Sequence, residues 1–245
     1  MLYSINPYRE AILSHDGSDD IIQSIKEVFG LLSKQTVTES QAKSLWEKLK
    51  AYNALIFNYA IQNDPCEVLE KLMTYLNAKG IEYCSEFSVR FTLQMNAAPD
   101  EKREENGVIM PLVTTTPRAD LSEVVQDNLD VLDQGAVVTT RTQHADFSDY
   151  FIVKIDQFVA RPNPLDKENP IITPTVTPTI SDTIELEGHT YYAQSVISHI
   201  GTPSAGHYWF TIKNDDGTFV TFNDSHVYSA PGFGTNATVV LYKKK

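Results

Sequence analysis

Residues 195–224 read SVISHIGTPSAGHYWFTIKNDDGTFVTFND, and this stretch carries the most specific pattern in the chain. Two apolar runs flank the turn Asn214-Asp-Asp-Gly217, an arrangement typical of a β-hairpin. The hairpin places His207 at the start of one strand and Asn223 at the end of its partner. A histidine whose second ring nitrogen is held by a side-chain amide or carboxylate is the base of a cysteine or serine hydrolase. The stretch therefore predicts a base and the group that orients it.

The same residues also have a plainer interpretation. Taken separately, Gly206-His207-Tyr208 and Asn223-Asp224 are usually an edge histidine and a loop. A glycine directly before the histidine favours the functional interpretation, because it lets the backbone come close to another group in a cleft. The histidine would then lie at the rim of that cleft. Both interpretations stay open from these residues alone.

Elements on either side of the hairpin change type along the chain. Apolar residues recur at helix spacing within 1–80 and alternate with polar ones within 81–245. A helix is predicted to begin near Asp64, because an Asp N-cap is followed by Pro65 at the first helical position. Helices first and strands later indicate an α+β fold over 1–245. Helices are expected around 21–32, 42–49 and 64–76, and strands at 87–95, 150–160, 191–199, 207–213, 218–222 and 237–242.

Four other segments complete the predicted organisation. Residues 97–107 are polar and charged, and residues 161–182 carry five prolines among threonines, so both are predicted to be exposed loops. Residues 121–129 are predicted to form a short helix. The near-continuous apolar run at 150–160 predicts a strand buried on both faces.

Composition and charge exclude several classes of protein. The chain has 245 residues, of which 42% are hydrophobic, enough for a buried core. Its net charge of −12 disfavours nucleic acid as a partner and favours a basic or mixed-charge protein. No apolar run reaches the about 18 residues of a membrane span, and residues 1–9 lack a secretory-signal pattern, so a cytoplasmic or other intracellular location is expected. Cys66 and Cys84 form no CxxC motif, so neither a metal site nor a cofactor is expected.

The order of residues in 195–242 resembles the histidine box of the ubiquitin-specific proteases, a family of cysteine deubiquitinases. That box runs as an apolar strand, His, Gly, a short loop, Gly-His-Tyr, a second apolar strand, a turn and Phe-(Asn or Asp)-Asp. The resemblance implies a papain-like cysteine protease fold with a helical thumb and a β-sheet palm and fingers. It also implies a hydrolase that cleaves the isopeptide bond after ubiquitin's C-terminal glycine. We expect a monomer whose partners are ubiquitin or ubiquitinated proteins.

A second block, Gln62-Asn-Asp64-Pro-Cys66-Glu67-Val-Leu69, resembles the family's Gln-x-Asp-x-x-Glu-(Phe or Leu)-Leu helix start. The resemblance implies that Asp64 meets the arginine-containing tail of ubiquitin and that Glu67 is the family's glutamate three residues on. From the residues alone, the simpler interpretation is a helix N-cap at Asp64 with Glu67 as its capping-box partner. Both roles can hold at once.

The resemblance also implies roles for individual residues. His207 would be the catalytic base and Asn223 the group that holds its imidazole. Asp224 is a third catalytic candidate, which either orients a loop or water or partly replaces Asn223. His199 is expected to pack or form a hydrogen bond beneath the site. The implied substrate-binding residues are Asp64, Glu67, His199, Gly206 and Tyr208.

The chain departs from the family pattern at the nucleophile. Family members carry a cysteine box, Gly-x-x-Asn-x-Gly-x-(Thr or Ser)-Cys-Tyr-x-Asn, upstream of the position matched by Leu2, and the 245 residues contain no match to it. Cys66 lies on an apolar helix stripe and is expected to be buried and inert, and Cys84 precedes a strand far from the box. Two hypotheses stay open: a deubiquitinase domain truncated at its N-terminus, or a catalytically inactive ubiquitin-binding pseudoprotease.

Overall fold

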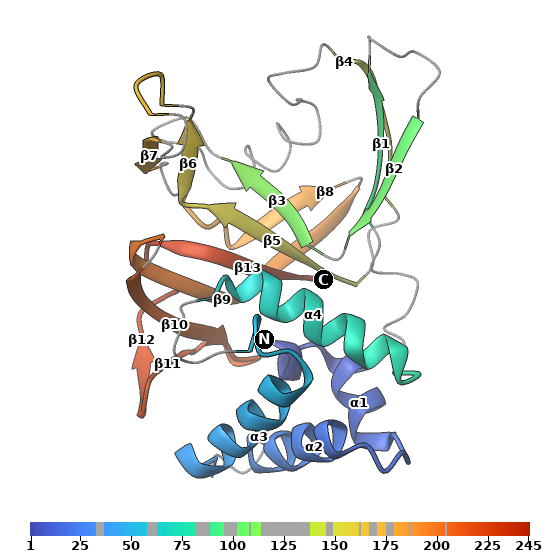
Figure 1. The fold of residues 1–245 in the computed structure, drawn as a ribbon, viewed down its shortest axis with the longest axis vertical. Helices are drawn as coiled ribbons and strands as arrows, with labels where there is room; N and C mark the ends of the chain where they lie inside the picture. Colours follow the sequence, from blue (N-terminus) through green and yellow to red (C-terminus); the bar gives the residue numbers. More distant parts are fainter. Residues whose placement is uncertain are drawn as a thin grey trace.

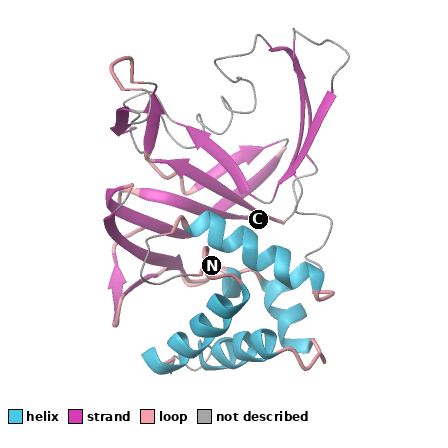
Figure 2. Cartoon of the chain, viewed as in Figure 1, coloured by secondary structure: helices cyan, strands magenta, loops and turns pink. Residues whose placement is uncertain are grey.

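The computed structural model of the chain describes residues 1–32, 37–57, 63–81, 89–95, 102–107, 109–113, 138–145, 149–161, 163–166, 171–174, 179–186, 188–203 and 205–245. Helices gather at one end of the molecule, and strands make up the rest (Figures 1 and 2). The predicted α+β class is confirmed, with the helices preceding the strands along the chain. Among the described residues, no helix is both long and apolar enough to cross a membrane.

Local sequence signals explain where the helices begin. Thr38 forms a capping box with Gln41 at the start of one helix, and Asp64 caps another through the backbone N–H of Cys66, 2.8 Å away. Of the helices, α1 was not predicted separately, because its nine residues bury only Tyr8 and Ile12. The described helical elements are η1 (Leu2–Ser4), α1 (Asn6–Ser14), α2 (Asp20–Leu32), α3 (Glu39–Tyr52) and α4 (Pro65–Ala78).

Asp19 ties the beginning of α2 to the far end of α4. Its Oδ1 accepts hydrogen bonds from the backbone N–H of Ile22 at 3.1 Å and from the hydroxyl of Tyr75 at 2.6 Å, while its Oδ2 lies 2.9 Å from Lys79 Nζ. Burial alone raises the pKa of the Asp19 carboxyl. The hydrogen bonds outweigh burial and lower this pKa from 3.8 to about 2. Asp19 is therefore ionised whenever the helical end is folded near neutral pH.

The main sheet carries the residues of the predicted site. Among the described residues its strand order is β12-β11-β10-β9-β13-β5-β3, with β8 paired to β9. Neighbouring strands are antiparallel, except that β3 runs parallel to β5. The strands are β3 (Ile109–Val113), β5 (Tyr150–Asp156), β8 (Thr183–Leu186), β9 (His189–Thr202), β10 (Ala205–Lys213), β11 (Phe219–Asn223), β12 (His226–Ala230) and β13 (Ala237–Lys244).

Apolar residues cover both faces of the central strands. On β5, Ile152 joins the core beneath the helices, whereas Phe151 and Val153 join a second core on the opposite face. Strand β13 divides in the same way, with Leu241 in the first core and Val240 in the second. This alternation explains the near-continuous apolar run, because a strand covered on both faces needs apolar residues at successive positions. The central strands therefore form a rigid base for the residues at their ends.

The structure corrects three sequence-based expectations. The strand predicted over 150–160 is interrupted at Gln157, between β5 and β6 (Phe158–Arg161). Part of the predicted loop 161–182 is a strand, β7 (Ile171–Pro174), which pairs with β6. Part of the predicted loop 97–107 is also a strand, β2 (Lys102–Gly107), because backbone hydrogen bonds to a neighbour allow a charged sequence to form an edge strand.

That neighbour belongs to a smaller sheet at the end of the molecule opposite the helices (Figure 1). Its strand order is β2-β1-β4, in which β1 is Val89–Met95 and β4 is Val138–Ala145. The alternating run predicted at 87–95 thus forms a strand from Val89 onward. The short helix predicted at 121–129 lies outside the described residues.

Candidate active site

His207 and Asn223 come together because of the register of the hairpin. Strands β10 and β11 pair Phe210 with Phe222, so continuing the ladder places Asn223 opposite Trp209, on the same face as His207. The distance from His207 Nε2 to Asn223 Oδ1 is 2.6 Å. The rings of His207 and Trp209 are stacked with their centroids 6.2 Å apart. The predicted partners are therefore within hydrogen-bond distance.

This hydrogen bond determines which nitrogen of His207 can act as a base. An amide oxygen only accepts hydrogen bonds, so Nε2 carries the proton and donates it to Asn223 Oδ1. The lone pair of the neutral imidazole is then on Nδ1. The His207 side chain is 42% exposed, so the ring is accessible from solvent. The arrangement can accept a proton at Nδ1 while Asn223 keeps the ring in place.

Asp224 is close to His207 but does not hold it. Its Oδ2 lies 3.9 Å from His207 Nε2, beyond hydrogen-bond distance, and its side chain is 76% exposed. The backbone of Asp224 has φ 51°, in the left-handed region that Asp tolerates in tight turns. It forms the turn into β12, so a catalytic role for Asp224 stays a prediction.

His199 lies beneath the hairpin in a buried layer. Its Nδ1 donates to Gln157 Oε1 at 3.0 Å, and its ring packs against Tyr208 with the centroids 4.3 Å apart. Gln157 Nε2 in turn donates to the backbone carbonyls of His199 and Asn236, at 3.1 and 2.9 Å. Burial, and then the charge of nearby His207, lower the pKa of His199, so it is neutral near pH 7. His199 thus packs and forms a hydrogen bond beneath the hairpin, as the sequence predicted, and its substrate contact stays a prediction.

Gly206 is required by this layer. A Cβ at this position would overlap the His199 imidazole and lie 2.5 Å from the carbonyl oxygen of Ile200. The sequence predicted that the glycine allows a close approach in a cleft. In the structure, the group that approaches Gly206 is the His199 ring, so the glycine has a packing role. The substrate contact predicted for Gly206 stays a prediction.

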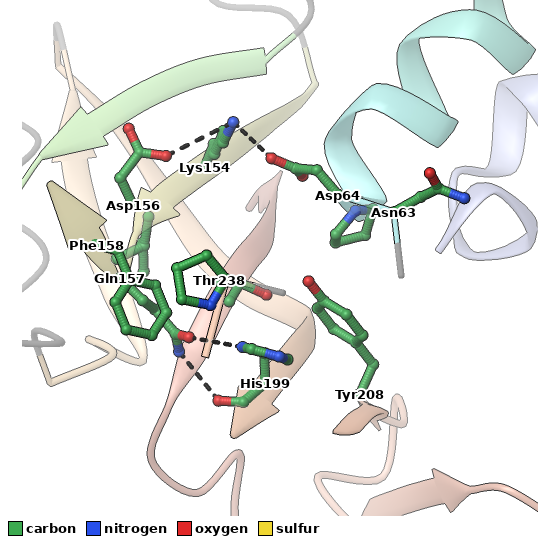
Figure 3. Close-up of a pocket in the computed structure, with 12 residues that line it drawn as sticks. Asn63, Asp64, Lys154, Asp156, Gln157, Phe158, His199, Tyr208 and Thr238 are labelled. Carbon is green, nitrogen blue, oxygen red and sulfur yellow. Dashed lines mark hydrogen bonds and ion pairs between the residues drawn. The ribbon is translucent and has the colours of Figure 1, made fainter. Parts of the chain in front are cut away.

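Asp64 belongs to a pocket of about 180 Å³ between the beginning of α4 and the ends of the central strands (Figure 3). Tyr208 and His199 also line it, and the Tyr208 hydroxyl points toward α4 (Figure 3). Burial, with the charge of Asp64, raises the pKa of Tyr208 to about 12, so its hydroxyl stays protonated. Three of the residues predicted to bind substrate therefore share one pocket.

Glu67 does not line this pocket. It lies exposed on α4, and the cap bond of Asp64 goes to the N–H of Cys66. Its predicted substrate contact stays a prediction. Conversely, the sequence did not single out Lys154, Asp156 and Gln157, which all line the pocket. The sequence did contain a signal for Lys154 and Asp156, because both are charged and lie at the end of an apolar strand that is buried on both faces. Charged residues in such a place need partners.

The thiol of Cys66 is not placed for chemistry. Its side chain is only 2% exposed, and burial, together with the charge of Asp64, raises its pKa. Cys84 lies outside the described residues. Among the described residues, no group of His, Cys, Asp and Glu side chains is arranged to hold a metal ion.

A family model for ubiquitin carboxyl-terminal hydrolase matches residues 1–242 of the sequence. The chain belongs to this family. Its α+β fold is thus the papain-like fold of the ubiquitin-specific proteases, as the sequence predicted. No curated protein matches the sequence at a significant level.

Solved structures resemble this chain in fold. One is the SAGA DUB module of Ubp8, Sgf11, Sus1 and Sgf73 bound to monoubiquitin, with a TM-score of 0.74 and 14% identity over 100% of this chain and 65% of that one. The same module bound to ubiquitin aldehyde has a TM-score of 0.70 and 15% identity, over 99% of this chain and 64% of that one. An essential yeast splicing factor has a TM-score of 0.70 and 11% identity, over 100% of this chain and 65% of that one. This chain thus spans about 65% of the length of these structures.

Proposed function

We propose that this chain is the base-supplying and ubiquitin-recognising part of a deubiquitinase, which hydrolyses the isopeptide bond after ubiquitin's C-terminal glycine. The observation that carries the proposal is the 2.6 Å contact between His207 Nε2 and Asn223 Oδ1, because it leaves the Nδ1 lone pair as the base. Membership of the hydrolase family supports it. Structures of similar fold that hold monoubiquitin or ubiquitin aldehyde support ubiquitin as the partner.

The chemistry needs a thiol beside His207, which a segment of the family's cysteine-box type would supply. The thiol proton passes to Nδ1, and the thiolate attacks the carbonyl carbon of ubiquitin's terminal glycine. The imidazolium then gives its proton to the departing lysine amine, and water hydrolyses the thioester. Asn223 keeps Nε2 protonated and the ring oriented throughout both steps.

A ubiquitin activity probe with a thiol-reactive C-terminus tests this function. The chain by itself should not be labelled, because Cys66 is buried. When the chain is preceded by a segment carrying Gly-Asn-Thr-Cys-Tyr, the new cysteine should be labelled at neutral pH. His207→Ala should abolish labelling and Asn223→Ala should reduce it less, whereas His189→Ala, which removes an exposed histidine at the start of β9, should have no effect.

The second candidate function is that of a ubiquitin-binding pseudoprotease. It is favoured by the burial of Cys66, the one cysteine among the described residues. A folded chain with the cysteine segment that binds ubiquitin but is not labelled would establish this alternative. Labelling of Cys66 or Cys84 in the unmodified chain would instead refute the proposal that the nucleophile lies in a cysteine box.

Ubiquitin binding is tested separately by calorimetry on the unmodified chain. Asp64→Ala should weaken binding of intact ubiquitin, because Asp64 lines the pocket proposed for the tail. Ubiquitin without its C-terminal tail is the matched control. Equal affinity for the intact and the truncated form would remove the tail pocket from the proposal.

A further inference from the structure

The Asp64 pocket already contains a cation. Lys154 Nζ, on β5, lies 2.7 Å from Asp64 Oδ2 (Figure 3). Asp64 Oδ1 accepts a hydrogen bond from the backbone N–H of Cys66 at 2.8 Å. Both carboxylate oxygens are therefore engaged in the structure. The side chains of Lys154 and Asp64 are 28% and 34% exposed, so the ion pair faces the pocket and is accessible from solvent.

A second carboxylate shares the same lysine. Asp156 Oδ1 lies 3.6 Å from Lys154 Nζ, and its side chain is 33% exposed (Figure 3). Asp64, Asp156 and Lys154 together carry one net negative charge when all are ionised, and two if the lysine is removed. Burial alone lowers the pKa of Lys154. The hydrogen bond and charge of Asp64 outweigh burial and raise this pKa, so Lys154 stays charged at neutral pH.

A positively charged guest must therefore compete with Lys154. A guanidinium group that pairs with Asp64 must share the carboxylate with the ammonium or displace it, and in either case it lies close to that positive charge. An uncharged guest of the same shape does not face this competition. The lysine thus acts against arginine, whereas the shape of the pocket and the Tyr208 hydroxyl serve neutral side chains equally well.

We propose that Lys154 determines the charge specificity of this pocket, by cancelling the preference for arginine that Asp64 and Asp156 would otherwise create. The inference rests on the proposed function, because it concerns the tail that the pocket would bind. At this pocket, an arginine of the bound tail would then gain little from its positive charge. Lys154 here is a specificity residue and takes no part in the chemistry at His207.

The test uses the complete chain and two small probes, acetyl-arginine amide and acetyl-citrulline amide, titrated by NMR. These probes have nearly the same shape but differ in charge. The native chain should bind both with affinities within about twofold. Lys154→Met should bind the arginine probe about five- to tenfold more tightly, the size expected for one partly exposed charge pair, and leave the citrulline probe unchanged. Lys154→Gln, a second neutral variant, should shift in the same direction.

Two further variants control the experiment. Lys213→Met removes a lysine that lies 4.0 Å from Asp182 outside the pocket, with similar exposure (26%), and should change neither affinity. Asp64→Asn should weaken only the arginine probe, because Lys154 then faces the guest with one carboxylate fewer. Unchanged arginine affinity in both Lys154 variants would overturn the inference. So would equal tightening of both probes, because that would mean a change of space and not of charge.

The same variants separate this inference from the proposed function. The small probes report on the pocket without ubiquitin and without a thiol. If the probes discriminate as expected but no variant binds ubiquitin, the proposed function fails and the charge specificity stands. If ubiquitin binds the native chain, while Lys154→Met alters the affinity of neither the arginine probe nor ubiquitin, the inference fails and the proposed function stands.

Discussion

Replacing Gly206 with alanine tests the layer beneath the hairpin. The new Cβ would overlap the His199 ring and lie 2.5 Å from the carbonyl oxygen of Ile200, so both the side chain and the backbone must move. Such overpacking typically costs about 1–3 kcal/mol. Displacing His199 also breaks its 3.0 Å hydrogen bond to Gln157, which contributes about 1 kcal/mol more. We expect Gly206→Ala to lower the free energy of unfolding by about 2–4 kcal/mol.

For a chain of this size, that loss lowers Tm by roughly 5–15 °C, measurable by circular dichroism or urea unfolding. Gly30, in α2, is the matched control: a Cβ there meets no atom within 4 Å, so Gly30→Ala should raise stability by about 0.5–1 kcal/mol. The double variant Gly206→Ala with His199→Ala should lose less than the sum of the single losses, because the imidazole no longer overlaps the Cβ. A Tm of Gly206→Ala equal to that of the native chain would refute this account of the glycine.

Three other predictions concern stability and reactivity. The pKa of Asp19 is lowered from 3.8 to about 2, so its contribution to stability is complete above pH 3.8 and is lost as the pH falls through 2. Asp19→Asn should therefore be less stable than the native chain near neutral pH. Urea unfolding should show this difference in stability shrinking between pH 3.8 and pH 2. A Cys84→Ser variant should not react with a thiol reagent until it is unfolded, because Cys66 is 2% exposed. Thr211 and Thr221, both buried, share a 2.9 Å hydrogen bond, so either Thr→Val change should cost about 1–3 kcal/mol and the double change less than the sum.

The sequence predicts those parts of the site that depend on short-range patterns. The pairing of His207 with Asn223 follows from a hairpin whose turn is predicted at Asn214 to Gly217. The start of α4 is predicted by Asp64 and the proline after it. These features need only local register and local capping. The fold class follows in the same way, from a change in apolar spacing along the chain.

Contacts between distant segments could not be predicted in this way. Lys154 and Asp64 are far apart in the sequence, and nothing in either stretch indicates that α4 begins beside the end of β5. Gln157 looked like an ordinary residue of a strand, although its side chain joins His199 to the carbonyl of Asn236. Such partners depend on how the layers pack, and apolar spacing determines that a face is buried without determining what covers it.

The position of the His207–Asn223 pair in the sheet affects how the site responds to heat. The pair lies on β10 and β11, and in the described part of the main sheet only β12 lies beyond them in the strand order. On these three strands the buried residues are Thr211 and Thr221, whereas β5, β9 and β13 hold most of the apolar core of the sheet. Local opening of β10–β12 therefore exposes little apolar surface and needs less free energy than global unfolding. Backbone amides of the hairpin should exchange with deuterium before those of β13, and thermal loss of the His207–Asn223 pairing should then be a reversible local event that precedes melting of the helices.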